Sequence, residues 1–176
     1  MIAQTLSNLL KVFLLIIVTS FTFADYRLST GDEIRIQTYG EDDLTFNSIT
    51  IGSTGQFSFP FVGQVVAKGQ TPEQIQSYLE SKLKPDYLVN PKVTVTVVKF
   101  RQFYINGEVK SPGGIDYQPG LNLRKAVTLA GGFTERASRT GMYVIREGEE
   151  SSKGTKVDLN YEVLPGDVIT IQTSFF

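Results

Sequence analysis

The chain has 176 residues, of which 41% are hydrophobic and 20% are charged, and its formal net charge at pH 7 is −1. This composition is typical of a folded protein, and it argues against a disordered chain or one with several membrane spans. The small net charge indicates no nucleic-acid partner. The absence of cysteine excludes disulfides, thiol catalysis and cysteine-ligated metal.

The first residues differ from the rest of the chain. An unbroken apolar run, VFLLIIV at residues 12–18, follows the single cation Lys11, and small residues precede Asp25. This pattern predicts a signal peptide over residues 1–24, cleaved between Ala24 and Asp25. The alternative is an uncleaved membrane anchor, but the apolar run falls short of the ~20 residues that a span needs. We therefore expect a mature protein in the periplasm of a Gram-negative cell, without a lipid because no cysteine is available for one.

The first half of the mature chain reads as a series of short strands. Alternation of apolar and polar side chains predicts a half-buried strand over residues 32–36. Three further strands are expected at residues 48–51, 56–59 and 63–66, separated by glycine and proline, and together they predict a compact β meander. A strand rich in β-branched residues, 92–100, closes this half.

A helix is expected between the meander and that last strand. Thr71 and Gln74 form a capping box around Pro72, which fits the first turn, and Pro85 ends the helix. One face carries an apolar stripe of Ile75, Tyr78, Leu79 and Leu83.

The second half begins near Lys99, which divides the chain into domains at 25–99 and 100–176. It opens with a strand at 102–106 and a turn at Ser111-Pro112-Gly113. A helix over 123–130 follows, capped by Asn122 and stopped by Gly131-Gly132, and then strands at 142–146, 155–159 and 168–171. This order predicts a small α+β unit of the β-grasp type. Because domains this small are marginal alone, we expect them to pack against each other or against other subunits.

One phrase occurs twice. YRLSTGDEIRIQT, residues 26–38, and YEVLPGDVITIQT, residues 161–173, agree at seven of thirteen positions. Each copy predicts a short strand, a reversal at Gly-Asp and a second strand. We interpret Asp32 and Asp167 as turn residues that hydrogen-bond the local backbone, rather than as catalytic carboxylates.

The chemistry of most enzymes is missing. The chain has no histidine, which excludes Ser-His-Asp triads and histidine metal sites, and it has no phosphate-binding or dinucleotide-binding glycine motif. We expect no cofactor and no metal. A hydrolase with two carboxylates remains open, and Glu41, Asp42 and Asp43 form the densest acidic cluster, although a solvated loop is the simpler interpretation.

Some side chains are candidates for contact with a glycan. Flat tyrosine rings can stack on sugars, although rings in β sequence commonly serve packing, and arginines can line the path of an acidic polymer, although they are commonly ordinary surface. The candidates are Tyr39, Tyr104, Tyr117, Tyr143, Arg136 and Arg139.

The order of motifs resembles the outer-membrane polysaccharide export family. It runs from YRLSTGDEIRI through GQFSFPFVGQVVAKGQTPEQ and NPKVTVTV to GEVKSPGG, and LRKAVTLAGGF through LPGDVITI resembles the soluble-ligand-binding β-grasp (SLBB) module. The matching framework positions are Gly31, Asp32, Pro60, Gly63, Gly107, Glu108, Pro112, Gly113, Ala130, Gly131, Gly132, Pro165, Gly166 and Asp167.

The resemblance implies a ring-forming periplasmic homo-oligomer that guides a capsular or exopolysaccharide chain and is not an enzyme. Its implied partners are the polysaccharide and an inner-membrane polysaccharide copolymerase. Longer Wza-like members carry a lipidated cysteine, a further β-grasp module and a C-terminal pore helix, which are absent from this sequence. We therefore expect a separate outer-membrane β-barrel to supply the pore. The alternatives are a monomeric periplasmic glycan-binding module and the two-carboxylate hydrolase.

Overall fold

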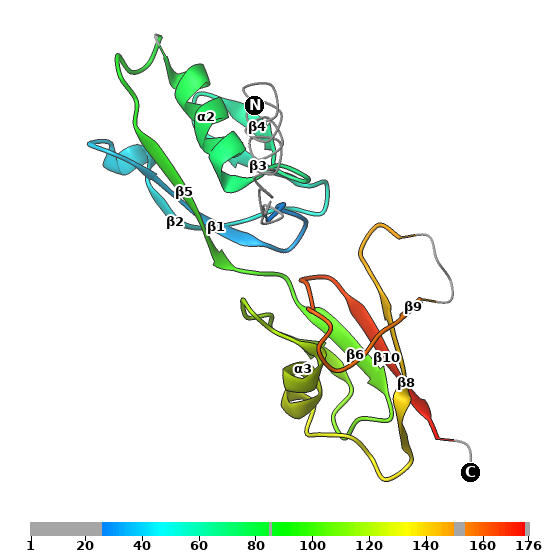
Figure 1. Ribbon diagram of the computed structural model, residues 1–176. Helices are drawn as coiled ribbons and strands as arrows, with labels where there is room; N and C mark the ends of the chain where they lie inside the picture. Colours follow the sequence, from blue (N-terminus) through cyan, green and yellow to red (C-terminus); the bar gives the residue numbers. More distant parts are fainter. Residues whose placement is uncertain (1–25, 85, 150–153, 175–176) are drawn as a thin grey trace, which may run out of the picture.

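The computed structural model describes residues 26–84, 86–149 and 154–174, so the predicted cleavage site at Ala24 and Asp25 lies outside them. The chain forms two small domains that lie end to end (Figure 1). Each has its own hydrophobic core, one drawn from residues 28–95 and the other from residues 103–171. Both combine helix and strand, which confirms the α+β class.

The first domain is built on a three-stranded antiparallel sheet in the order β2-β1-β5. Its strands are β1 (Glu33–Thr38), β2 (Phe46–Thr50) and β5 (Val93–Lys99), and a 3-10 turn η1 (Asp42–Leu44) joins the first two. The predicted meander is wrong, because β3 (Gln56–Phe59) and β4 (Gly63–Val66) form a separate hairpin. This hairpin turns its apolar side chains onto the core, which leaves the second edge of β1 for β5.

Helix α2 (Pro72–Leu83) covers the same core, alongside the hairpin (Figure 1). The capping box is confirmed: the Gln74 amide N–H donates to Thr71 Oγ1 at 3.3 Å, and the Thr71 amide N–H donates to Gln74 Oε1 at 2.9 Å. The predicted apolar stripe is wrong at Tyr78, which is 39% exposed. The other three members, spaced four residues apart, are enough to cover the core.

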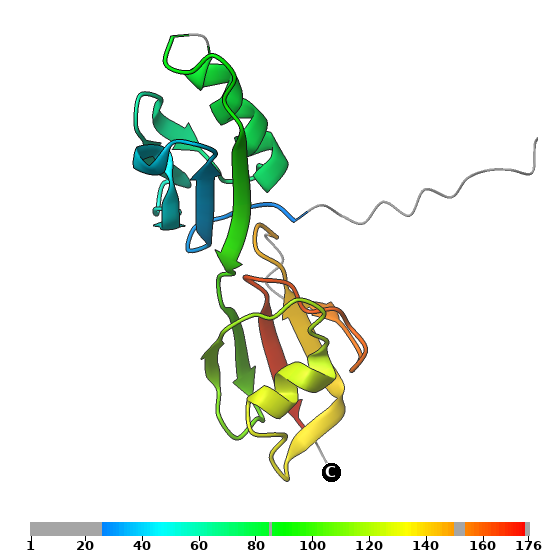
Figure 2. The same ribbon diagram turned by 90° about the vertical axis from the view of Figure 1, so that its left-hand side faces the viewer.

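The second domain is a five-stranded sheet in the order β7-β6-β10-β8-β9 with one helix against it. Its elements are β6 (Phe103–Gly107), β7 (Gly113–Ile115), α3 (Leu123–Leu129), β8 (Ala137–Ile145), β9 (Thr155–Lys156) and β10 (Val168–Thr173). Strand β10 runs parallel to β6 and antiparallel to β8. Figure 2 shows α3 in front of one face of this sheet, as expected for a β-grasp unit.

The ends of α3 follow the predicted signals. The Asn122 side chain accepts a hydrogen bond from the Lys125 amide N–H at 3.0 Å. At the other end Gly131 and Gly132 have φ of 78° and 90°, a left-handed conformation that stops a helix. The Ala130 side chain between helix and stop is fully buried.

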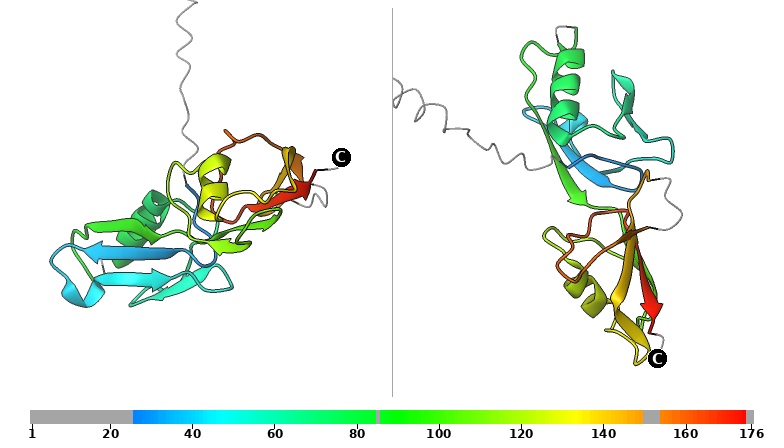
Figure 3. Two further views of the ribbon diagram at one scale, coloured as in Figure 1. Left: turned by 90° about the horizontal axis from the view of Figure 1, so that it is seen from below. Right: turned by 45° about the vertical axis from the view of Figure 1, so that its right-hand side comes forward.

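Among the described residues, no helix lies over the opposite face of this sheet (Figure 3). Tyr104 is paired in register with Val168, and Thr170 with Tyr143. Since side chains in register point to the same face and alternate along a strand, both tyrosines lie on the face opposite α3.

Among the described residues, no helix is long and apolar enough to cross a membrane.

Candidate functional site

Both copies of the repeated phrase fold into the same turn. An oxygen of Asp32 accepts from the Ser29 amide N–H at 2.8 Å, and one of Asp167 accepts from the Leu164 amide N–H at 2.9 Å. The interpretation of both aspartates as turn formers is confirmed. The strand expected before each turn is wrong. In the first copy the tyrosine folds back instead, so that Tyr26 Oη donates to Asp32 Oδ2 at 2.6 Å. Neither residues 26–29 nor residues 161–164 form a strand, although Glu162 makes an isolated β-bridge with Asn122.

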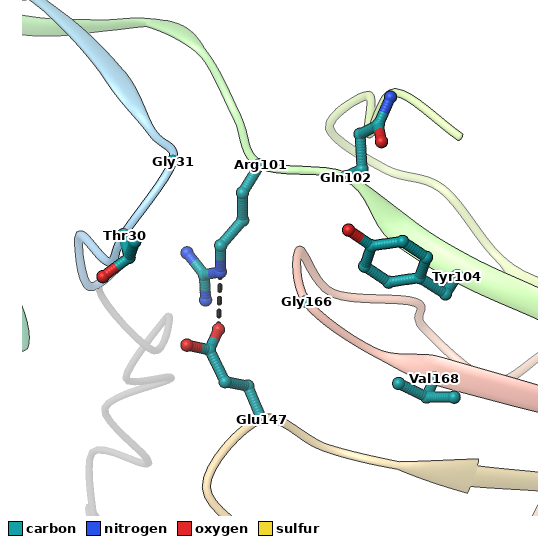
Figure 4. A pocket seen from close by; sticks show the side chains of 8 residues that line it. All are labelled: Thr30, Gly31, Arg101, Gln102, Tyr104, Glu147, Gly166 and Val168. Carbon is teal, nitrogen blue, oxygen red and sulfur yellow. Dashed lines mark hydrogen bonds and ion pairs between the residues drawn. The ribbon is translucent and has the colours of Figure 1, made fainter. Parts of the chain in front are cut away.

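The first turn is bonded to the second domain through Arg101. This residue lies in the three-residue connector between β5 and β6. Its backbone N–H donates to Asp32 Oδ1 at 2.8 Å, and its Nη1 donates to Asp32 Oδ2 at 3.1 Å and to Tyr26 Oη at 2.7 Å. Its Nε donates to Glu147 Oε2 at 2.6 Å (Figure 4). One guanidinium therefore bonds carboxylates of both domains.

Glu147 also contacts the first domain directly. Ser29 Oγ donates to Glu147 Oε1 at 2.9 Å. The Asp32 side chain is fully buried and that of Arg101 is 17% exposed, so little water competes for this pair. Removing one partner of a buried ion pair costs about 3–5 kcal/mol, because the remaining charge is left without compensation. Burial and the hydrogen bond to Asp32 also raise the pKa of Tyr26, so that it remains a donor.

An aromatic stack covers the other side of the connector. The ring of Phe100 lies edge-on to Tyr26 at 4.9 Å between centroids and to Tyr117 at 5.4 Å. Tyr26 belongs to the first domain and Tyr117 to the second. Polar and apolar contacts together restrict the relative movement of the domains at a connector too short to act as a flexible linker.

Two glycines of the predicted framework are required by close approach. A Cβ atom on Gly166, which has φ of +87°, would lie 2.5 Å from Glu147 Oε2. A Cβ atom on Gly107, which has φ of +83°, would lie 2.0 Å from the carbonyl oxygen of Ile171 in the paired strand. Gly166 therefore makes room for the junction, and Gly107 for the parallel pairing of β6 with β10.

Beside the junction lies an open depression of about 460 Å³. Tyr104, half exposed, stands on one side of it, and Arg101 with Glu147 on the other (Figure 4). The lining residues are Thr30, Gly31, Arg101, Gln102, Tyr104, Glu147, Gly166 and Val168. This depression is the candidate functional site, because it joins both domains, an exposed ring and several polar groups.

Glu108 accepts hydrogen bonds from three residues at the end of the five-stranded sheet that lies away from the junction. Its carboxylate accepts from Thr134, from Thr173 Oγ1 at 3.0 Å and from Arg136 Nη2 at 3.3 Å. Hydrogen bonds from the two threonines hold the pKa of Glu108 below its usual value. Arg139 lies over the Phe133 ring at 4.2 Å. Both candidate arginines thus lie away from the junction and have partners within their own domain.

The predicted glycan contacts are not all brought together. Tyr104 and Tyr143 share one face of the second domain, Tyr117 packs against Phe100, and Tyr39 is 81% exposed in the first domain. The acidic cluster forms the single turn η1 and the residue before it, so its carboxylates do not face each other across a cleft. No group of three potential metal ligands occurs within residues 26–84, 86–149 and 154–174.

The other framework residues shape turns. Pro60 lies in the turn between β3 and β4, and Gly63, with φ of 82°, begins β4. Pro112 precedes Gly113, the first residue of β7, and Pro165 is buried next to Gly166.

Sequence reasoning missed the residues that hold the junction together, namely Phe100, Arg101 and Glu147. Arg101 reaches Asp32 and Glu147 over separations of 69 and 46 residues. No local pattern marks a pair so distant. The available signal was that Tyr and Asp recur six residues apart in both copies. An aspartate that is buried in such a turn requires hydrogen-bond donors, and these can come from a distant part of the chain.

Comparisons with known proteins agree with this architecture. The profile of the polysaccharide biosynthesis/export protein family matches residues 22–98, and that of the SLBB domain matches residues 102–156. Fold and profiles together define a two-domain protein in which a polysaccharide export domain precedes an SLBB domain. The chain is thus similar to the polysaccharide export family over its first domain and to SLBB domains over its second.

Its relatives carry related names. Exopolysaccharide production protein ExoF of Rhizobium meliloti is 29% identical over 120 residues, covering 62% of this chain and 28% of ExoF. EPS I polysaccharide export outer membrane protein EpsA of Ralstonia nicotianae is 26% identical over 171 residues, covering 82% of this chain and 44% of that protein. EpsA of Ralstonia solanacearum is 29% identical over 134 residues, covering 61% and 35%. The chain spans less than half the length of these relatives.

Proposed function

We propose that this chain is a non-catalytic periplasmic subunit of a polysaccharide export machine, associated with the outer membrane. The observation that carries the proposal is the match of both family profiles, in order, to two domains whose junction contains a buried ion pair. Subunits that keep one domain orientation can assemble into a regular ring. The proposed assembly is an oligomeric conduit for a capsular or exopolysaccharide chain.

The proposed partners are an inner-membrane polysaccharide copolymerase and a separate outer-membrane β-barrel. A polysaccharide cannot cross a bilayer unaided, since its hydroxyl groups would lose their hydrogen bonds to water. An export route therefore needs an aqueous pore, which we assign to the barrel, with the conduit beneath it.

Exposed apolar side chains support assembly through the first domain. Among the described residues it carries seven of the nine large hydrophobic side chains that are exposed. Phe61 and Tyr87 form an aromatic pair with centroids 4.7 Å apart, and Val89 nearby in the chain is 87% exposed. Phe61 also has φ of 62°, a strained conformation for a bulky residue. Exposed apolar groups of this kind mark interaction surfaces.

The role in export is tested by deleting the gene in its host. Loss of cell-surface polysaccharide, restored by the wild-type gene, is the expected result. Undiminished surface polysaccharide in the deletion strain would rule the function out.

The assembly is tested by native mass spectrometry in the presence of the copolymerase and barrel. Phe61→Asn removes the ring, and asparagine tolerates a positive φ, so the fold should persist while the oligomer weakens. Leu129→Asn, at a half-exposed position in the second domain, is the matched control and should leave the oligomer intact. A wild-type protein that stays monomeric while binding saccharide would favour the monomeric glycan-binding module.

A further inference from the structure

We propose that the depression at the domain junction binds a neutral saccharide, with one sugar ring stacked on Tyr104. The inference rests on the proposed function for the class of ligand, since the exported polymer is a saccharide. It adds a particular binding site and particular contacts, which neither the family profiles nor the names of the relatives supply.

Tyr104 offers the apolar platform that stacking requires. It is 50% exposed, although Phe103 and Ile105 on either side of it are almost completely buried. Val168 lies beside it in the paired strand. Gly114, opposite it in β7, lets the ring edge and the Gln102 side chain lie close to that strand, since a Cβ there would lie 3.1 Å from Tyr104 Cε1 and 2.6 Å from Gln102 Oε1.

Polar groups stand opposite the ring, where they can meet sugar hydroxyls. Figure 4 shows the Tyr104 hydroxyl on the side of the ring that faces Arg101 and Glu147, with Thr30 beyond them. The Arg101 hydrogen bonds use Nε, Nη1 and the backbone N–H. Within the described residues no hydrogen bond uses Arg101 Nη2 or the hydroxyls of Tyr104 and Thr30, and the proposal assigns these groups to the sugar hydroxyls.

The charge balance favours a neutral ligand over an anionic one. The positive charge of Arg101 is shared between Asp32 and Glu147 at 3.1 and 2.6 Å. Since two carboxylates face one guanidinium, no positive charge remains to attract an acidic sugar. A saccharide with many hydroxyls and no charge meets both the donors and the acceptors.

The size of the site fits a short saccharide segment. Small-ligand pockets usually enclose about 300–1,000 Å³, and this one measures about 460 Å³ and opens to solvent. A longer chain can continue over the uncovered sheet face towards Tyr143, which strand spacing places about 12 Å away. One polymer could therefore contact both tyrosines.

The site is tested by titrating the purified chain with cellohexaose and with maltohexaose while recording amide NMR shifts. We expect saturable shifts at Gly31, Gly166 and Val168 with at least one of them. Tyr104→Ala should weaken binding about tenfold, because the platform is lost, and Tyr104→Phe should stay within about threefold of the wild type. Tyr78→Ala, an exposed tyrosine of the first domain, is the control. No saturable binding of either saccharide, or equal binding by Tyr104→Ala, overturns the proposal.

The result of this binding test can be distinguished from the result of the gene-deletion test of the proposed function. If gene deletion abolishes export but Tyr104→Ala binds hexasaccharide like the wild type, the site is wrong and the function stands. If saccharide binding depends on Tyr104 but deletion leaves export unchanged, the site stands and the function is wrong.

Discussion

The two copies of the tyrosine turn share a local structure and differ in their surroundings. In both, an aspartate accepts from a backbone N–H three residues earlier, and a tyrosine six residues before the aspartate donates to it. In the first copy Arg101 approaches Asp32 from the connector and continues to Glu147 of the other domain. In the second copy Arg146 Nε donates to Tyr161 Oη at 2.8 Å, and no ion pair joins it to Asp167 in the described part of the chain.

The same local turn therefore has a different structural role in each domain. Within the described residues the Asp32 carboxylate accepts four hydrogen bonds, two of them from Arg101, whereas the Asp167 carboxylate accepts two, and the one from Tyr161 is long at 3.4 Å. Burial raises the pKa of Asp167 by more than the Leu164 N–H and the nearby Arg146 lower it. The carboxylate of the first turn therefore anchors the domain junction, whereas the hydrogen bonds of the second carboxylate stay within its own domain.

The largest effect is expected from truncating the two aspartates. Asp32→Ala should lower the free energy of unfolding by about 3–5 kcal/mol, because Arg101 and Tyr26 lose a buried acceptor. Asp167→Ala should cost about 1–3 kcal/mol, because it leaves one backbone N–H without its acceptor. Urea denaturation followed by circular dichroism measures both. Equal losses would mean that the two turns are energetically equivalent.

A smaller contrast is expected between the two turn glycines. Gly31→Ala should cost about 1–2 kcal/mol, from the positive φ alone, because its Cβ would meet only Arg101 Cβ at 3.6 Å. Gly166→Ala should cost about 2–3 kcal/mol, since its Cβ also displaces Glu147 from Arg101. Residual dipolar couplings should report altered domain orientation for Gly166→Ala only. An unchanged orientation in that variant would count against the role of Glu147.

The pH dependence of stability should distinguish the second turn. The folded chain binds a proton at Asp167 more readily than the unfolded chain does, because burial raises the pKa above its ordinary value of 3.8. The stability that Asp167 contributes should thus rise as the pH falls from neutrality through the raised pKa, and be complete below 3.8.

Asp167→Asn keeps an acceptor for the Leu164 N–H and removes the titration. Its stability relative to the wild type should be highest at pH 7 and decline towards pH 4, as measured by thermal unfolding. Asp43→Asn, at an exposed position, should show no such trend. A constant difference between Asp167→Asn and the wild type would contradict the prediction.

The smallest effect is expected from single hydroxyls. Ser29→Ala removes the hydrogen bond to Glu147 and should cost less than about 1 kcal/mol, since the Glu147 side chain is 37% exposed. Ser48→Ala removes a serine–glutamate bond of the same length, to Glu33, which is exposed and lies within the first domain. Only Ser29→Ala should increase interdomain motion, as measured by NMR relaxation. Similar motion in both variants would show that Glu147 contributes little to the junction.

Much of the fold could be predicted because its signals are local. The capping box at Thr71 and Gln74, the helix stop at Gly131-Gly132 and the alternation of β1 all act within a few residues. Strand pairing is not local, which is why the predicted meander failed. Strand β5 pairs with β1 across some sixty residues that include the hairpin and α2.

The candidate site was predictable only in part. Gly31 and Gly166 belong to the repeated turn motif and to the family framework, and Tyr104 was one of the tyrosines predicted to contact a glycan. Arg101 and Glu147 carry no such mark, because a charged residue at the end of a strand is ordinary surface until its partner is known.

The sequence by itself determined the two turns, the helices with their caps and the classification as two small α+β units, because these depend on backbone preferences and on the spacing of apolar residues. Only the tertiary structure decided that Arg101 joins Asp32 to Glu147, that Phe100 lies between two tyrosines, and that Tyr104 faces an open depression. Those contacts unite segments far apart in the chain, and their strength comes from the exclusion of water between groups that only the complete fold brings together.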